Sequence, residues 1–154
     1  GDILKTETKY FGEIEYEATD VLHFAKGIFA FEEEKRFLLL PFAGSDGTLL
    51  CLQSLATPGL AFVLMNPFSL CATYAPELTA DELAELGVDD SHQLCYYVMC
   101  VVKSPVANST LNLKCPVVIN DETLQAMQVI LENDDYGMRH LLSEFAAAEG
   151  AEKC

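Results

Sequence analysis

The side chains most able to do acid–base, nucleophilic or metal chemistry are three histidines and six cysteines, and their spacing favours none of these. His23, His92 and His140 lie far apart, so no His-x-His or His-x-x-x-His pair exists for a metal. No two cysteines have the C-x-x-C spacing of zinc and redox sites, and the G-x-S-x-G, P-loop, G-x-G-x-x-G and H-E-x-x-H signatures are absent. We therefore predict no catalytic residue, no metal and no cofactor. A Cys–His pair assembled by the fold stays open as an alternative.

The surroundings of these residues also indicate structural roles. His23 lies within the apolar stretch 21–24, so we expect a hydrogen-bonded structural histidine rather than a base. Most cysteines lie in apolar runs, such as those around Cys51 and Cys100, where cysteine behaves as a small hydrophobic residue. Cys154, in a polar tail, is the exception that we expect to be exposed.

Acidic side chains greatly outnumber basic ones. Among 154 residues, 24 are Asp or Glu and 9 are Lys or Arg, so the formal net charge is −15 and the pI is near 4.3. Such a chain repels nucleic-acid phosphates and anionic membrane surfaces. It favours basic proteins or cations as partners, although a plain solubility role explains the charge equally well.

Apolar runs predict a chain built mostly of β-strands. Residues 13–17 alternate with a period of two, which places Ile14 and Tyr16 on the inner face and the three glutamates toward water. Two apolar runs around a turn at 44–47 predict a hairpin. The predicted strands are 13–17, 20–24, 37–42, 48–53, 60–65, 94–102, 116–120 and 127–131.

Two short helices complete the expected elements. Thr79 and Glu82 form a capping box, and Gly87 is placed to end the helix that follows it. A second helix is expected over 139–148, with a frayed tail beyond Gly150. Many short strands with short connections predict a mainly β fold, an antiparallel-dominated barrel or sandwich with helical decoration.

Length and composition indicate one domain. Hydrophobic residues make up 51% of the chain, and no Pro-, Gly- or Ser-rich linker divides it. Charged residues such as Lys5 and Glu7 interrupt any apolar segment near the start, and no run reaches the roughly 18 apolar residues of a membrane helix. We therefore expect a cytoplasmic protein that does not enter a membrane.

A series of short blocks extends over nearly the whole chain. They are TKYFGEI (8–14), HF (23–24), GI (27–28), FE (31–32), LQSL (52–55), P with LAFV (58 and 60–63), PF (67–68), L with ELG (83 and 85–87), NL (112–113), PVVIN (116–120), QVIL (128–131) and Y with RH (136 and 139–140). Each block is short and mostly apolar, whereas their order and spacing together are specific. Over about residues 5–142 this order resembles the FliW family of bacterial flagellar assembly factors.

The chain departs from the family pattern in places. The family often shows Pro-x-Gly and then Pro-Gly-Phe-Glu where this chain has AKG (25–27) and FAFE (29–32). An Asp-Pro-Phe of many members is NPF (66–68) here. From Ser143 onward the chain has no counterpart in the family. The resemblance therefore implies one FliW-like β-barrel domain over 1–142 and a helical or frayed tail over 143–154.

The resemblance implies a regulator that is not an enzyme and that has a β-rich pseudo-barrel fold. Proteins of this family bind flagellin in the cytoplasm, and they also bind CsrA, a small basic RNA-binding repressor of translation. When flagellin is exported, the freed protein captures CsrA and relieves repression of flagellin messenger RNA. The resemblance favours a non-competitive mode of antagonism. We expect the protein to be monomeric when free.

For partner contact we predict residues of surface type within the matched blocks. The predicted contact residues are Glu13, Phe31, Glu32, Gln53, Ser54, Asn66, Asn112, Arg139 and His140. For each of them, turn and cap chemistry that satisfies backbone groups is an equally good explanation. The sequence does not divide them between flagellin and CsrA.

Two functions of other classes stay open. The first is a small β-barrel that binds a flavin or another small ligand, although the scarcity of Lys and Arg disfavours an anionic one. The second is an acidic decoy that binds nucleic-acid-binding proteins in general through charge alone.

Overall fold

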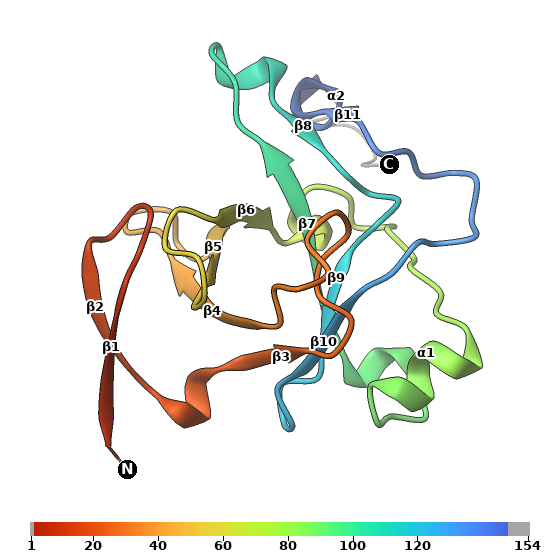
Figure 1. The fold of residues 1–154 in the computed structure, drawn as a ribbon. Coiled ribbons are helices and arrows are strands. Elements are labelled where there is room, and N and C mark those ends of the chain that lie inside the picture. The colour runs from red at the N-terminus through yellow and green to blue at the C-terminus, as the bar shows by residue number, and fades with distance from the viewer. Residues whose placement is uncertain (1, 148–154) are drawn as a thin grey trace.

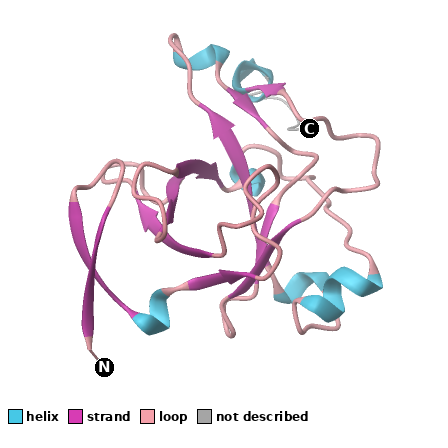
Figure 2. Ribbon diagram, viewed as in Figure 1, coloured by secondary structure: helices cyan, strands magenta, loops and turns pink. Residues whose placement is uncertain are grey.

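The apolar runs form the strands of a closed β-barrel. The structure, a computed structural model, describes residues 2–147. Within them, neighbouring barrel strands pair in the order β7-β6-β5-β4-β3-β10-β9, and β9 pairs with β7 again to close the ring (Figures 1 and 2). These strands are β3 (Leu22–Phe24), β4 (Arg36–Pro41), β5 (Leu49–Ser54), β6 (Ala61–Met65), β7 (Cys95–Val101), β9 (Val117–Ile119) and β10 (Gln125–Gln128).

The strand directions confirm the predicted fold class. Within the barrel every neighbouring pair is antiparallel except β3 with β10, which run parallel. The predicted hairpin is β4 with β5, and its turn contains Gly44 and Gly47 in the left-handed region with φ of 81° and 78°. Glycine adopts that region without the clash that a Cβ atom would cause. The chain is therefore mainly β and antiparallel-dominated.

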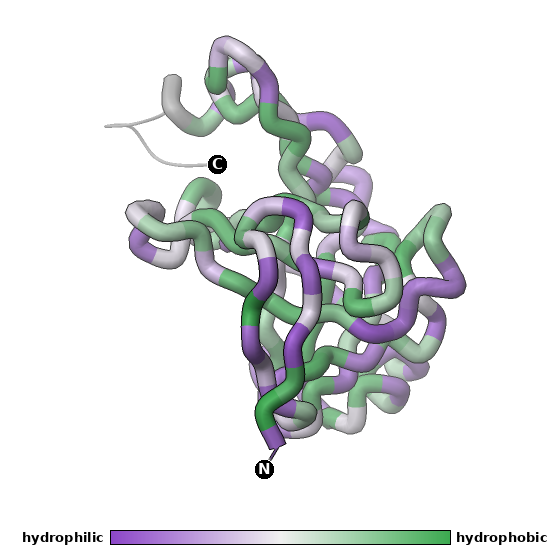
Figure 3. The backbone as a smooth tube through the Cα atoms, turned by 60° about the vertical axis from the view of Figure 1, so that its left-hand side comes forward, coloured by the Kyte–Doolittle hydropathy of each residue, from purple (hydrophilic) through white to green (hydrophobic). Residues whose placement is uncertain are grey.

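The first two strands form a hairpin outside the barrel. β1 (Ile3–Glu7) pairs only with β2 (Glu13–Glu17), and the two form a separate sheet (Figure 1). As predicted, Ile14 and Tyr16 are half-buried while the glutamates of β2 are exposed. Hydrophilic segments recur along both strands in Figure 3. β1 itself was not predicted, because its residues are exposed or half-buried and its sequence has no apolar alternation.

Strand β7 separates two hydrophobic cores. Its side chains alternate in direction, so Tyr96, Val98 and Cys100 pack into one core, while Tyr97 and Met99 pack against the other. The second of these cores is the barrel interior. It is filled by side chains that are at most 4% exposed, namely Leu22, Phe24, Ile28, Phe37, Leu52, Leu64, Val117, Ile119 and Ala126. Apolar side chains therefore fill the barrel interior.

The other core lies on the outside of the barrel under a second layer of short elements. That layer contains η2 (Pro67–Ser69), α1 (Ala80–Glu85), η3 (Ser91–Gln93), η4 (Val106–Asn108), β8 (Thr110–Leu111), β11 (His140–Leu141) and α2 (Leu142–Ala147). Outside this layer, η1 (Ala18–Asp20) joins β2 to β3. Leu86 and Phe145 come from the two ends of the layer, and both are buried in this core. In Figure 1, α1 and α2 lie at opposite ends of the molecule.

The capping box predicted for the first helix is present. Thr79 Oγ1 accepts a hydrogen bond from the Glu82 N–H at 3.1 Å, and Glu82 Oε1 accepts one from the Thr79 N–H at 2.8 Å. Gly87 follows the C-cap with φ of 75°. Helix α1 therefore begins and ends where local sequence signals place its ends.

Three local predictions were wrong. The second helix starts at Leu142 rather than at Arg139, because His140 and Leu141 pair with β8 as β11; its predicted end at 148 lies outside the described residues, as do the tail and Cys154. His23 is exposed on β3, and within residues 2–147 its side chain makes no hydrogen bond, so the hydrogen-bonded structural role expected for it is not found. The strand predicted over 127–131 ends at Gln128, and beyond it only Val129 and Leu131 donate to carbonyls of the facing segment.

Gly27 offers a direct test of backbone packing. It has φ of 70°, and a Cβ atom placed there would lie 2.5 Å from the carbonyl oxygen of Glu32. We expect Gly27→Ala to lower the free energy of unfolding by at least about 3 kcal/mol, because left-handed strain adds to a backbone clash. Urea unfolding at equilibrium measures this.

Gly12→Ala is the matched control. Gly12 has φ of 67° and nothing within 4 Å of its Cβ position, so only the strain of about 1 kcal/mol applies. Equal losses in the two variants would contradict the packing of residues 27–32.

Candidate partner-binding surface

An exposed apolar groove lies where β6 and β7 separate. We name it the apolar groove; its volume is about 620 Å³ and it is lined by Tyr10, Phe42, Ala61, Phe62, Val63, Met99, Cys100, Val101 and Val102. Val101 and Val102 are 57% and 56% exposed. The groove is thus a small, mostly apolar opening in which two valines face solvent.

The groove exists because the ladder between β6 and β7 is incomplete. β5 pairs with β6 from Leu49–Met65 to Gln53–Ala61, whereas β7 pairs only with Val63, Leu64 and Met65. Continuing the same register would place Phe62 opposite Val101, but Cys100 is the last residue of β7 that pairs with β6, and Val101 pairs only with Thr110 of β8 on the other edge of β7. The two strands diverge at this point, and their side chains line the opening.

A rigid loop extends the aromatic surface beyond the groove. Ile28 is buried and exchanges two backbone hydrogen bonds with Phe31, at 3.2 and 2.7 Å, and between them Ala30 has φ of 72°. The amide N–H of Phe29 donates to Gln128 Oε1 at 3.0 Å. The loop therefore displays Phe29 and Phe31, which are 42% and 40% exposed, and the Phe31 ring lies 5.6 Å from that of Phe62.

The predicted contact residues Gln53 and Ser54 are fully buried at the end of β5. Gln53 Oε1 accepts from the N–H of Lys9 at 2.9 Å, and its Nε2 donates to three carbonyls, of Ser54, Pro58 and Leu60. The Ser54 hydroxyl donates to Glu34 and accepts from two backbone N–H groups of the following turn. Both side chains therefore position the adjoining loops and do not face solvent. Through Lys9, Gln53 holds Tyr10 at the groove.

The two predicted asparagines close turns. Asn66 Oδ1 accepts from the N–H of Phe68 at 2.9 Å and caps η2. Asn112 Oδ1 accepts from the N–H groups of Lys114 and Cys115 at 3.1 and 2.9 Å. Each fixes the direction of the chain after a strand, which is the structural alternative stated for these residues.

The remaining predicted residues lie at separate places. Glu13 is exposed on β2 opposite Glu7, an arrangement of like charges that destabilises a strand pair. Glu32 is exposed and its Oε2 accepts from the N–H of Ala30. Arg139 is exposed, and His140 Nε2 accepts from the N–H of Gly137 at 2.7 Å while Nδ1 lies 3.2 Å from Glu144.

The nine predicted residues thus do not form one site. Phe31, Glu32, Gln53 and Ser54 surround the loops beside the apolar groove, because Glu34 bonds Ser54 and Phe31 contacts Phe62. Asn112 and His140 gather at the β8–β11 pair, while Glu13 and Asn66 stand apart. Sequence reasoning missed Tyr10, Phe42, Phe62, Val101 and Val102, which lie in different segments and meet only when the barrel closes.

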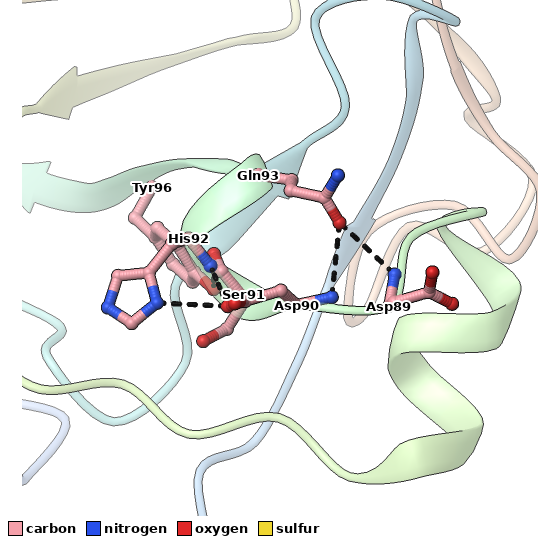
Figure 4. A network of polar contacts seen from close by, with 6 residues as sticks. All are labelled: Asp89, Asp90, Ser91, His92, Gln93 and Tyr96. Atoms are coloured by element: carbon pink, nitrogen blue, oxygen red, sulfur yellow. Dashed lines mark hydrogen bonds and ion pairs between the residues drawn. The ribbon is translucent and has the colours of Figure 1, made fainter.

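A second concave feature lies beside η3. We name it the aromatic pocket; its volume is about 450 Å³, and it is lined by Phe68, Tyr74, Ala75, Pro76, Glu77, Ser91, His92, Leu94 and Tyr96. Asp90 caps η3 and accepts from both the N–H and the Nδ1 of His92, at 2.8 and 2.9 Å (Figure 4). These hydrogen bonds hold the pKa of Asp90 below its usual range, so this carboxylate stays charged at neutral pH.

The thiols offer little nucleophilic chemistry. Burial raises the pKa of Cys51 to about 11, and it also raises the pKa values of Cys95, Cys100 and Cys115. At neutral pH these groups are protonated, whereas the thiolate is the reactive form. Among the described residues, no three His, Cys, Asp or Glu side chains gather as metal ligands. Within the same part of the chain both α-helices have six residues, far short of a membrane span of about 20.

Comparison with known proteins identifies the family. A model of the family described as FliW protein matches residues 5–142. The chain belongs to the FliW family. A protein named flagellar assembly factor FliW from Geobacillus kaustophilus is 41% identical over 139 residues, covering 90% of this chain and 95% of that protein. One with the same name from Syntrophomonas wolfei is 36% identical over 146 residues, covering 95% and 93%.

A solved structure confirms the barrel as a FliW fold. The crystal structure of a flagellar assembly factor FliW superposes with a TM-score of 0.84 at 39% identity, over 90% of this chain and 96% of the other. The resemblance inferred from short blocks is therefore confirmed. The match spans nearly the whole length of these FliW proteins, so the surfaces described above lie on a FliW domain.

Replacing Gln53 tests whether its buried hydrogen-bond network stabilises the fold. Gln53→Ala removes one acceptor and one donor group that serve four backbone partners, so we expect a loss of about 2–4 kcal/mol in the free energy of unfolding. In a nitrogen–proton NMR spectrum the amide signals of Lys9 and Tyr10 should also shift. Truncation of the exposed Gln125 to Ala is the control and should cost less than about 0.5 kcal/mol. Equal costs would show that the network is not a stabilising element.

Proposed function

We propose that this chain is a flagellar assembly factor that acts by binding. It binds flagellin in the cytoplasm, and it binds and antagonises the translational regulator CsrA, which couples flagellin synthesis to export. Family membership is the observation that carries the proposal, together with relatives that are named flagellar assembly factors. The protein is a monomer when free, and it has no catalytic role, in keeping with thiols that burial keeps protonated.

Flagellin is the partner of the apolar groove. A protein that assembles into a polymer buries apolar surface against its neighbours, and before assembly that surface is exposed and available to a binding protein. The groove supplies Phe62 and Val101 for this contact, with Tyr10 and Phe42 on one side. Tyr10 and Phe42 contact each other at 5.6 Å, and Lys9 Nζ lies 5.3 Å from the Tyr10 ring, which supports the aromatic edge.

CsrA is the partner of the acidic surface. Its basic character complements a net charge of −15, and long-range attraction raises the association rate of oppositely charged proteins. Charge alone would also describe a decoy for any nucleic-acid-binding protein. A specific antagonist differs from a decoy because particular carboxylates contact the partner. The exposed Glu13 and Glu32 are the predicted ones.

The first prediction concerns flagellin. Val101→Asp places a charge in the apolar groove, so we expect at least about tenfold weaker flagellin binding with unchanged CsrA binding, because a buried unpaired carboxylate is costly. Isothermal titration calorimetry measures both affinities. Val106→Asp is the matched control, since Val106 is 62% exposed on η4 outside the groove. Unchanged flagellin binding in Val101→Asp would exclude the groove as its site.

The second prediction concerns CsrA. Raising the ionic strength from about 0.01 M to 0.15 M shortens the Debye length from about 30 Å to 8 Å. We expect the CsrA association rate to fall by about tenfold, with a much smaller change for flagellin. Stopped-flow fluorescence with labelled CsrA measures the rate.

The double variant Glu13→Lys with Glu32→Lys separates contact from steering. The matched control, Glu122→Lys with Glu132→Lys, changes the net charge equally at exposed positions outside the predicted set. We expect the first variant to weaken CsrA binding several-fold more than the control. If both double variants weaken CsrA binding equally, the interaction depends on overall charge, as for a decoy. If neither double variant changes CsrA binding, Glu13 and Glu32 are not part of the interface.

A further inference from the structure

The aromatic pocket combines ring faces with negative charge. Phe68 is 40% exposed, and its ring centroid lies 5.7 Å from that of Tyr74 and 6.1 Å from that of Tyr96. Both tyrosine rings are almost fully buried, at 3% and 6% exposed. The pocket therefore has a floor of buried tyrosine rings, and the partly exposed ring of Phe68 lies at its mouth.

Each ring is held in place by a separate hydrogen bond. The Tyr74 hydroxyl donates to the carbonyl of Leu113 at 2.8 Å, and the Tyr96 hydroxyl donates to the carbonyl of Ser91 at 2.9 Å. Asn66 caps the short helix that carries Phe68. A ligand entering the pocket meets rings that are already oriented, so little conformational entropy is lost on binding.

One carboxylate, that of Glu77, lines the pocket, and the sequence that follows it is acidic. Residues 77–93 contain six acidic residues and no Lys or Arg. One of them, Glu85, is paired with Lys26 at 2.7 Å from a distant segment. Glu77, which lines the pocket, is exposed and makes no ion pair within the described residues, and Asp90 lies next in the chain to the pocket residue Ser91 (Figure 4).

We propose that the aromatic pocket binds an arginine side chain presented by a basic protein partner; this rests on the proposed function, in which that partner is CsrA. A guanidinium group stacks on an aromatic face and donates in a planar fork to a carboxylate. Phe68, which is 40% exposed at the mouth of the pocket, supplies the face, the buried rings of Tyr74 and Tyr96 hold it in place, and Glu77 supplies the carboxylate. Complementary charge selects a cationic occupant over an apolar one.

The test titrates the full chain with N-acetyl-arginine methylamide and follows nitrogen–proton NMR signals. We expect saturable shifts at pocket residues such as Glu77 and His92, and weaker binding of N-acetyl-lysine methylamide, whose ammonium lacks a planar fork. Phe68→Ala and Glu77→Gln should each weaken arginine binding about fivefold or more. No saturable shift, or equal affinity for the lysine probe, would overturn the arginine assignment.

Two control variants carry the same chemical changes elsewhere. Ile130→Ala truncates another exposed apolar side chain, at 53% exposure, and Glu7→Gln neutralises an exposed carboxylate on β1; both should bind the probe as the parent chain does. Asn66 is a positioning residue, so Asn66→Ala should weaken binding while Asn66→Asp, which retains the cap, restores it. If Asn66→Asp also weakens binding of the arginine probe, the cap does not orient Phe68.

Titration with CsrA separates this inference from the proposed function. If CsrA binds the parent chain and binds the Phe68→Ala and Glu77→Gln variants more weakly, the proposed function and the arginine site are both supported. If CsrA binds all of these chains equally, the pocket is not its anchor and the inference fails alone. If CsrA does not bind the parent chain while the arginine probe binds in the pocket, the proposed function fails and the arginine site stands.

Discussion

Strand β7 pairs with three other strands, β6, β8 and β9, and these pairings determine the rest of the structure. Residues Cys95–Tyr97 pair with β9 and close the barrel, and Val98–Cys100 pair with β6. Its last residues pair with β8. A single seven-residue strand therefore joins the barrel to the second layer, and its alternating side chains fill both hydrophobic cores. Losing this strand would open the barrel and uncover both cores at once.

The same strand places the two candidate binding features. The apolar groove opens at its end, where Val101 no longer pairs with β6, and the aromatic pocket lies at its start, beside Tyr96. One feature is lined almost wholly by apolar groups, whereas the other combines aromatic rings with carboxylates. This division suits the proposed function, which has two chemically different partners. In that proposal the acidic net charge attracts a basic partner over long range, and the pocket and the groove select the partners.

Local signals predicted the elements that local chemistry determines. The capping box at Thr79 and the glycine turn between β4 and β5 are examples, because each depends on residues within a few positions. Prediction failed where a distant strand decides the outcome. His140 and Leu141 became a strand because β8 pairs with them, and Val101 and Phe62 became a groove because β6 and β7 diverge. Polar residues within apolar runs were recognised, but the buried Gln53 and Ser54 serve the backbone instead of the surface.

The central claim is that two separate surfaces at the two ends of β7 bind different partners. Hydrogen exchange measured by mass spectrometry on the full chain, alone and bound to each partner in turn, tests it most directly. Flagellin is predicted to protect segments 61–63 and 99–102, and CsrA to protect segments 66–77 and 89–96 together with the residues next to Glu13 and Glu32. Protection of the same segments by both partners would contradict the account.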